Sequence, residues 1–60
     1  MSFTFQVDQP DRDPVVRIRR LEGEAEALAF ARQLQSDWPD HQMIEVRREG
    51  ELLIRLRRHA

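Results

Sequence analysis

Apolar and polar residues alternate strictly at the start of the chain. Phe3, Phe5 and Val7 are each separated by one polar residue, which is the spacing of a strand with one buried face. We therefore predict a first strand over residues 2–7. Residues 8–14 contain two prolines and three aspartates, a composition that disfavours a sheet interior and predicts a loop.

The same alternation returns after the loop and predicts a second strand over residues 15–21. Val16 and Ile18 fall on one face of this strand, and Arg17 and Arg19 fall on the other. Because apolar side chains favour the core, we expect the two arginines on the uncovered side of the sheet.

Helical spacing replaces alternation in the middle of the chain. Gly23 is followed by Glu24 and Glu26, and carboxylates in a first helical turn are favoured by the helix dipole. The pattern predicts a helix that runs to about Asp37. Its apolar stripe, at intervals of three and four residues, consists of Ala27, Phe30, Ala31, Leu34 and Trp38.

Pro39 ends this helix, because proline disfavours helical geometry in the residue before it. Trp38 should therefore leave the helix and place its indole over the edge of the core. A helix that ends in Trp-Pro before a hairpin resembles small bacterial proteins in general, and this resemblance implies no function.

Two further strands, over residues 42–47 and 51–58, form a predicted hairpin. Gly50 suits the positive φ at the last position of a three-residue loop, Arg48-Glu49-Gly50. We reject a two-residue loop at Glu49-Gly50, since it would pair Ile44 with Arg55 and mix the two faces. The resulting register pairs Val46 with Leu52, Ile44 with Ile54, Gln42 with Leu56, Arg47 with Glu51, Glu45 with Leu53 and Met43 with Arg55.

The element order is therefore ββαββ, which predicts a small α+β domain over residues 1–60. Its sheet has four mainly antiparallel strands, and one helix packs on one face. The third strand can lie beside either the first or the second, because the connection through the helix allows both arrangements.

Composition narrows the ways in which so short a chain can be stabilised. A chain of 60 residues buries only about 60% of its unfolded surface. It has no cysteine and only two histidines, so disulfides and a structural metal are excluded and self-association remains. The net charge is −1 although all ten basic residues are arginine, so any basic site must be local.

One helix covers one side of the sheet, and the uncovered side is the candidate interaction surface. Apolar centres inside a ring of arginines are typical of protein interfaces, so we predict a homodimer formed through this side or through an edge strand. The candidate residues are Arg17, Arg19, Met43, Glu45, Arg47, Leu53, Arg55 and Arg57.

The same arginines support a second hypothesis, a nucleic-acid-binding module that contacts phosphates. It lacks exposed aromatic side chains for base stacking, since Phe3 and Phe5 alternate onto the buried face. A third interpretation of these arginines is a solvated face with cross-strand ion pairs.

Catalytic chemistry has the least support. The hydroxyl groups belong to Ser2, Thr4 and Ser36, and neither histidine has a nucleophile nearby in sequence. Asp37, Asp40 and His41 are better explained as a polar turn than as metal ligands. We therefore expect a non-enzymatic protein without cofactor or metal. No apolar run approaches the roughly 18 residues of a membrane span, so we also expect a cytoplasmic protein without a membrane partner.

Overall fold

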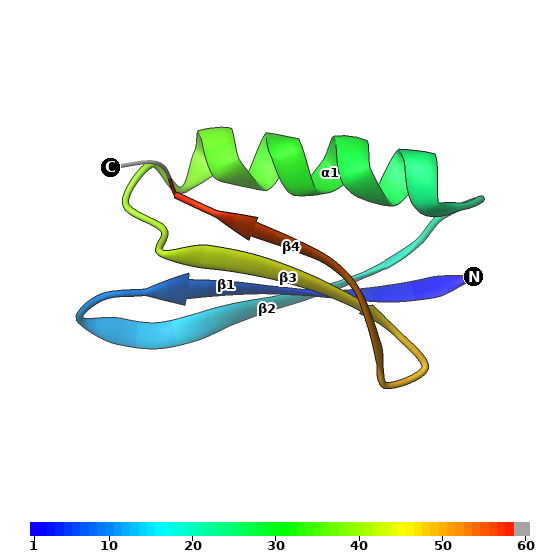
Figure 1. Cartoon of the computed structure of the whole chain (residues 1–60), viewed down its shortest axis with the longest axis horizontal. Helices are drawn as coiled ribbons and strands as arrows, with labels where there is room; N and C mark the ends of the chain where they lie inside the picture. Colours follow the sequence, from blue (N-terminus) through cyan, green and yellow to red (C-terminus); the bar gives the residue numbers. More distant parts are fainter. Residues whose placement is uncertain (59–60) are drawn as a thin grey trace.

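The computed structural model describes residues 1–58 and confirms the α+β class and the ββαββ order (Figure 1). Every pair of neighbouring strands is antiparallel, in the order β2-β1-β3-β4. The third strand therefore lies beside the first. The elements are β1 (Ser2–Gln9), β2 (Arg12–Arg20), α1 (Glu24–Asp37), β3 (Met43–Arg48) and β4 (Glu51–Arg57).

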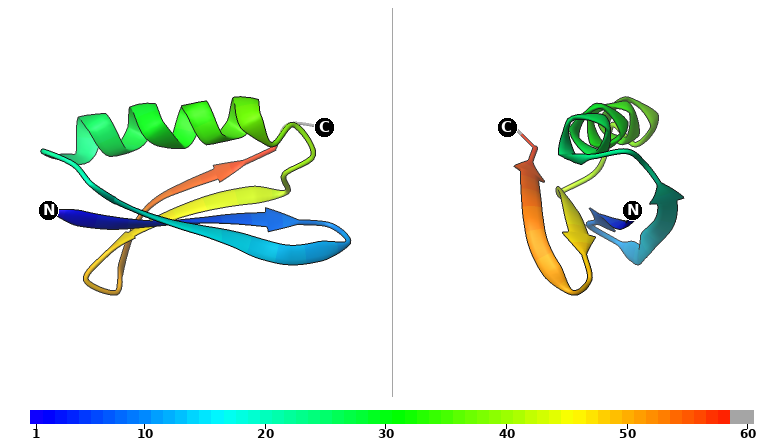
Figure 2. Two further views of the ribbon diagram at one scale, coloured as in Figure 1. Left: turned by 180° about the vertical axis from the view of Figure 1, so that it is seen from behind. Right: turned by 90° about the vertical axis from the view of Figure 1, so that its right-hand side faces the viewer.

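The sheet curls around α1, so that the helix lies on its concave side and the other side is convex (Figure 2). The helix packs mainly on the two central strands, β1 and β3. Alternation on β1 is confirmed, because Phe3, Phe5 and Val7 are fully buried beneath the helix. The rest of the core comes from the helix and β3: Ala27, Ala31, Leu34, Ile44 and Val46.

Both predicted ends of the helix are confirmed. Glu26 accepts a hydrogen bond from the backbone N–H of Glu22 at 3.0 Å, so a first-turn carboxylate holds the entry to the helix. Trp38 has φ −122°, outside the helical region, and its N–H still donates to the carbonyl of Leu34 at 2.9 Å. Its side chain packs against the core, as expected.

The predicted loop over residues 8–14 is wrong in extent. The first hairpin continues to a tight turn at Pro10 and Asp11, with Gln9 paired with Arg12. The pairing shifts by one residue between Val7 and Gln9, so β2 has one extra residue near Pro14. Proline is tolerated there because β2 is an edge strand. The extra residue also interrupts the pairing with β1 at this point, so the missing N–H of Pro14 leaves no hydrogen bond unmade.

The predicted register of the second hairpin is also wrong. Arg48 pairs with Glu51, and Glu49 and Gly50 form a two-residue turn with φ of 52° and 81°. Positive φ at Gly50 was predicted, but positive φ at Glu49 was not. A shift in pairing between Val46 and Arg47 makes Leu53 an extra residue on β4. This bulge restores the pairing of apolar residues that an unbulged two-residue turn would have broken.

The turn can be tested by substitution at both positions. Asparagine tolerates left-handed geometry better than glutamate, so Glu49→Asn should stabilise the domain by roughly 0.5 kcal/mol. Gly50→Ala should destabilise it by about 1 kcal/mol through backbone strain alone, because a Cβ at that position meets nothing within 4 Å. Urea denaturation measures both changes. An unchanged stability for Glu49→Asn would contradict the two-residue turn.

Candidate functional site

The structure exchanges the two predicted faces of β2. Phe3 pairs with Arg19 and Phe5 pairs with Arg17, and directly paired residues point to the same side of a sheet. Arg17 and Arg19 therefore lie on the helix side, and their predicted place on the uncovered side is wrong. Val16 and Ile18 occupy the outer side instead.

The physical reason is the position of β2 at the edge of the sheet. The helix covers β1 and β3, so the inner side of β2 faces the flank of α1, where long charged side chains keep access to water. The guanidinium of Arg17 lies 5.6 Å from the ring centre of Trp38, and that of Arg19 lies 5.3 Å from the ring centre of Phe30. Phe30 in turn meets Phe5 edge-to-face at 4.7 Å. The two arginines thus cover the aromatic side of the core.

The same two arginines also occupy the free backbone edge of β2. Met1 and Leu21 exchange both backbone hydrogen bonds, and bonded pairs alternate along an antiparallel ladder. The N–H and C=O groups of Val16 and Ile18 therefore point away from β1.

Arginine side chains satisfy two of these outward carbonyls. The Nη1 of Arg17 donates to the carbonyl of Val16 at 3.2 Å, and the Nη1 of Arg19 donates to the carbonyl of Ile18 at 3.0 Å. Pro14, further along the same strand, has no N–H to offer. Strand addition at the edge of β2 is thereby disfavoured.

Leu53 does not lie on the uncovered side either. It is partly buried and packs against the core, because the bulge turns it inward. Leu52, which pairs with Arg47, takes the outer position and is 38% exposed. The predicted apolar centre at Leu53 is therefore wrong.

The structure thus defines the outer face as the convex side of the sheet, away from α1. Met43, Glu45, Arg47, Arg55 and Arg57 lie there, as the sequence predicts. By the same register, the other members are Ser2, Thr4, Gln6, Asp8, Val16, Ile18, Arg20 and Leu52.

Two neighbouring rows of side chains cross this outer face from β2 to β4. The first row is Ile18, Thr4, Arg47 and Leu52. The second row is Val16, Gln6, Glu45 and Arg55.

Glu45 is the electrostatic centre of the outer face. It is only 6% exposed, and its Oε2 accepts hydrogen bonds from Arg55 at 3.2 Å and from Arg47 at 3.4 Å. Two arginines thus share one carboxylate and shield it from water. Burying a carboxylate without such hydrogen-bond donors would cost free energy.

Val16 and Ile18 are the apolar centre of the outer face. They are 50% and 63% exposed, among the few large apolar side chains left in water. Sequence reasoning missed them because it assigned the apolar side of β2 to the core. The deciding feature is the extra residue of β2 near Pro14. The turn at Pro10 and Asp11 alone would pair Phe5 with Val16, and the shift between Val7 and Gln9 pairs Phe5 with Arg17 instead.

His41 belongs to the turn between α1 and β3. It is buried, and its Nδ1 lies 2.6 Å from the carbonyl oxygen of Trp38, so this nitrogen donates. Its Nε2 lies 3.5 Å from the amide nitrogen of Gln35. The side chain therefore fixes the helix exit. Residues 1–58 contain no group of three or more potential ligands arranged to hold a metal ion.

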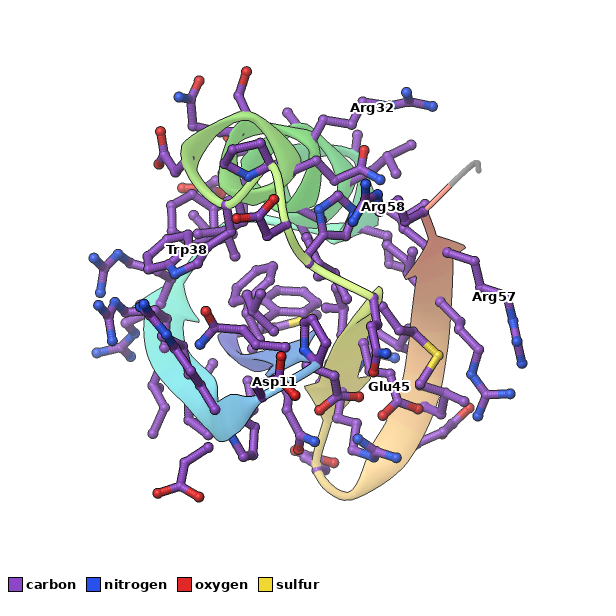
Figure 3. The ribbon with its side chains drawn as sticks, turned by 90° about the vertical axis from the view of Figure 1, so that its left-hand side faces the viewer. Asp11, Arg32, Trp38, Glu45, Arg57 and Arg58 are labelled. Atoms are coloured by element: carbon purple, nitrogen blue, oxygen red, sulfur yellow. The ribbon has the colours of Figure 1, made fainter. Side chains whose placement is uncertain are left out.

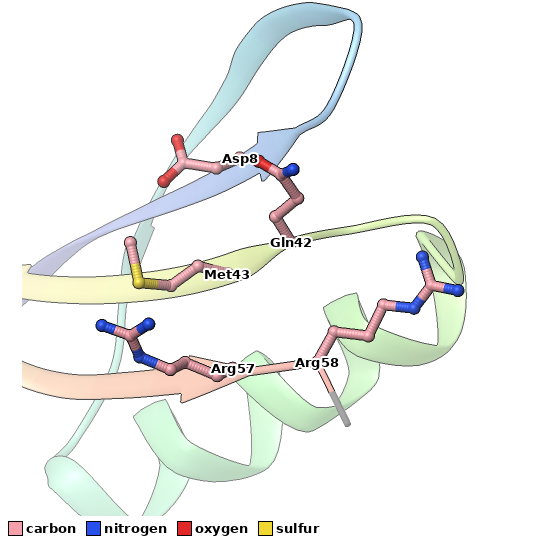
Figure 4. A pocket seen from close by; sticks show the side chains of 5 residues that line it. All are labelled: Asp8, Gln42, Met43, Arg57 and Arg58. Carbon is pink, nitrogen blue, oxygen red and sulfur yellow. The ribbon is translucent and has the colours of Figure 1, made fainter. Parts of the chain in front are cut away.

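A shallow pocket of about 510 Å³ lies at the end of β4, between Asp8, Gln42, Met43, Arg57 and Arg58 (Figure 4). It combines one carboxylate with two guanidinium groups and contains no hydroxyl, thiol or imidazole. Its lining therefore offers charged groups of both signs to a polar ligand. Within residues 1–58, no helix has the length and apolar character to cross a membrane.

Comparisons with protein-family models, with curated proteins and with solved structures give no match to this chain. The assignment of a function therefore depends on the geometry described above.

The cover over Trp38 can be tested through its fluorescence, since it is the only tryptophan of the chain. Arg17→Gln should increase quenching of Trp38 by iodide and lower the stability by about 0.5–1 kcal/mol, the value of an exposed cation–π contact. Arg20→Gln, on the same strand, is the control and should change neither quantity. Equal quenching in all three proteins would contradict the contact.

Proposed function

We propose that this protein is a non-enzymatic interaction module that binds a second copy of itself through the outer face. The observation that carries the proposal is the adjacent pair Val16 and Ile18, which are half or more exposed in the single chain. Small domains with little core commonly gain stability by association.

The two rows of the outer face are complementary to each other. Consider a two-fold axis that lies between the two rows and runs parallel to them, across the strands. This axis places the first row of one copy over the second row of the other copy. Ile18 then meets Val16, Thr4 meets Gln6, and Arg47 meets Glu45. At these three positions, apolar, polar and charged groups each face a suitable group. The fourth pair, Leu52 and Arg55, lies on β4, outside the shared band.

Curvature limits how much surface the two copies can share. Two convex sheets touch along a narrow band, which we place over β2 and β1, with Glu45 and Arg47 at its rim. A specific interface buries about 600 Å² on each partner at its lower limit, which is about one seventh of the 4375 Å² surface of this chain. We therefore expect a weak dimer, with a roughly micromolar dissociation constant.

An edge-to-edge dimer through β2 has less support. Arg17 and Arg19 occupy the outward carbonyls of Val16 and Ile18, and Pro14 lacks an N–H. The nucleic-acid hypothesis also loses support, because Arg17 and Arg19 leave the outer face and Glu45 pairs with two of the three predicted arginines that stay there.

The apolar centre is tested by Val16→Glu with Ile18→Glu. Both side chains are exposed, so the monomer should keep its cooperative melt, while the buried charges should abolish the dimer. Light scattering after size exclusion, over a protein concentration series, measures the mass. Leu52→Glu changes an exposed apolar residue at the other side of the outer face and should leave the mass unchanged. A wild-type monomer at about 1 mM protein would overturn the proposal.

The two-fold register is tested separately by charge reversal at Arg47. Arg47→Glu would place a carboxylate against Glu45 of the other copy and should weaken the dimer by about tenfold or more. Because it also removes the pair with Glu45 of its own chain, the thermal melt of the monomer is measured alongside. The loss should shrink between about 50 and about 500 mM salt, because screening reduces the repulsion. Arg57→Glu, outside both rows, is the control. Equal effects of the two substitutions would contradict this register.

A further inference from the structure

The free edge of β4 differs from that of β2 in having no side chain bonded to its outward carbonyls among residues 1–58. The N–H of Arg58 donates to the carbonyl of Gln42 at 3.1 Å, and bonded pairs alternate from there along the ladder. Arg55 and Arg57 therefore direct their backbone N–H and C=O groups away from β3. These groups form a template for another strand.

A groove of about 430 Å³ follows this edge of β4. Arg32 and Gln35 line it from α1, and Arg55, Leu56 and Arg57 line it from β4. Figure 3 shows Arg32 and Arg57 extending on the β4 side of the molecule, opposite Trp38. The groove thus combines outward backbone groups, one apolar side chain and several donors.

The charge of the groove indicates what kind of peptide strand could bind there. Arg55 is paired with Glu45 at 3.2 Å, but Arg32 and Arg57 take part in no ion pair within residues 1–58. Two guanidinium groups without a carboxylate beside one groove favour a negatively charged occupant. A second copy of β4 would bring the same arginines together and would be repelled.

We propose that the β4 edge binds an extended acidic peptide by strand addition. Backbone groups of the peptide pair with Arg55 and Arg57, its carboxylates meet Arg57, and Arg32 adds positive charge from the helix side of the groove. An apolar side chain of the peptide covers Leu56. This mode takes its affinity from main-chain hydrogen bonds and its selectivity from the side chains beside them.

The probe is a fluorescein-labelled octapeptide of alternating valine and glutamate, measured by fluorescence anisotropy at about 50 mM salt. We expect binding to shift the backbone amide signals of β4 in NMR spectra. A peptide with lysine in place of glutamate should bind about tenfold more weakly or worse. A glutamate peptide methylated on alternate backbone nitrogens should lose a similar factor, because it cannot donate to the edge.

Substitutions at Arg57 separate charge from backbone. Arg57→Gln should weaken binding by about three- to tenfold. Arg57→Pro also removes an outward N–H that makes no bond within the sheet, and it should cost a further factor of about three. Arg20→Gln, on the opposite edge, is the matched control and should bind normally.

Three results would overturn the proposal. They are absence of peptide binding, equal binding of the methylated peptide, and displacement of the peptide by a single-stranded oligothymidylate that binds more tightly. The last result would identify a general polyanion site. The chain with Val16→Glu and Ile18→Glu should bind the peptide like wild type, so this test stands apart from that of the dimer. If Arg57→Pro lost its melt, Arg57→Gln and the methylated peptide would still decide the question.

Discussion

The structure depends on the packing of one narrow helical stripe against the two central strands. Ala27, Ala31 and Leu34 of α1 meet Phe3 and Phe5 of β1, together with the apolar residues of β3. A helix of 14 residues covers no more than this, although the sheet has four strands. Both edge strands, β2 and β4, therefore lie at the margin of the core, and each has backbone N–H and C=O groups that are not paired within the sheet.

Arginine serves a different purpose at each edge. On β2, Arg17 and Arg19 lie over Trp38 and Phe30 and also satisfy the outward carbonyls of the strand. Guanidinium suits this position, because it stacks on rings and donates in several directions at once. On β4, Arg57 leaves the backbone edge open. The edge of β2 is therefore protected, and that of β4 is available to a partner of suitable charge.

The elements were largely predictable, and the candidate site was only partly so. Met43, Glu45, Arg47, Arg55 and Arg57 were placed correctly, because β3 and β4 alternate on both sides of the bulge. Arg17, Arg19 and Leu53 were misplaced, and Val16 and Ile18 were missed. Two causes explain these errors. On β2, a strand pattern states which residues share a face, but not which face meets the helix. On β4, the bulge at Leu53 interrupts the alternation itself.

By itself, the sequence determined the local features. Strict alternation produced β1, the three- and four-residue spacing produced α1, Trp38-Pro39 ended the helix, and Gly50 required a turn. Each of these follows from interactions within a few residues. Only the tertiary structure decided the place of β3 beside β1, the pairing of each hairpin and the inward side of β2. Those choices depend on which part of the four-stranded sheet the short helix covers. Whether a residue is apolar or charged is a property of that residue, but whether it is buried depends on the elements packed around it.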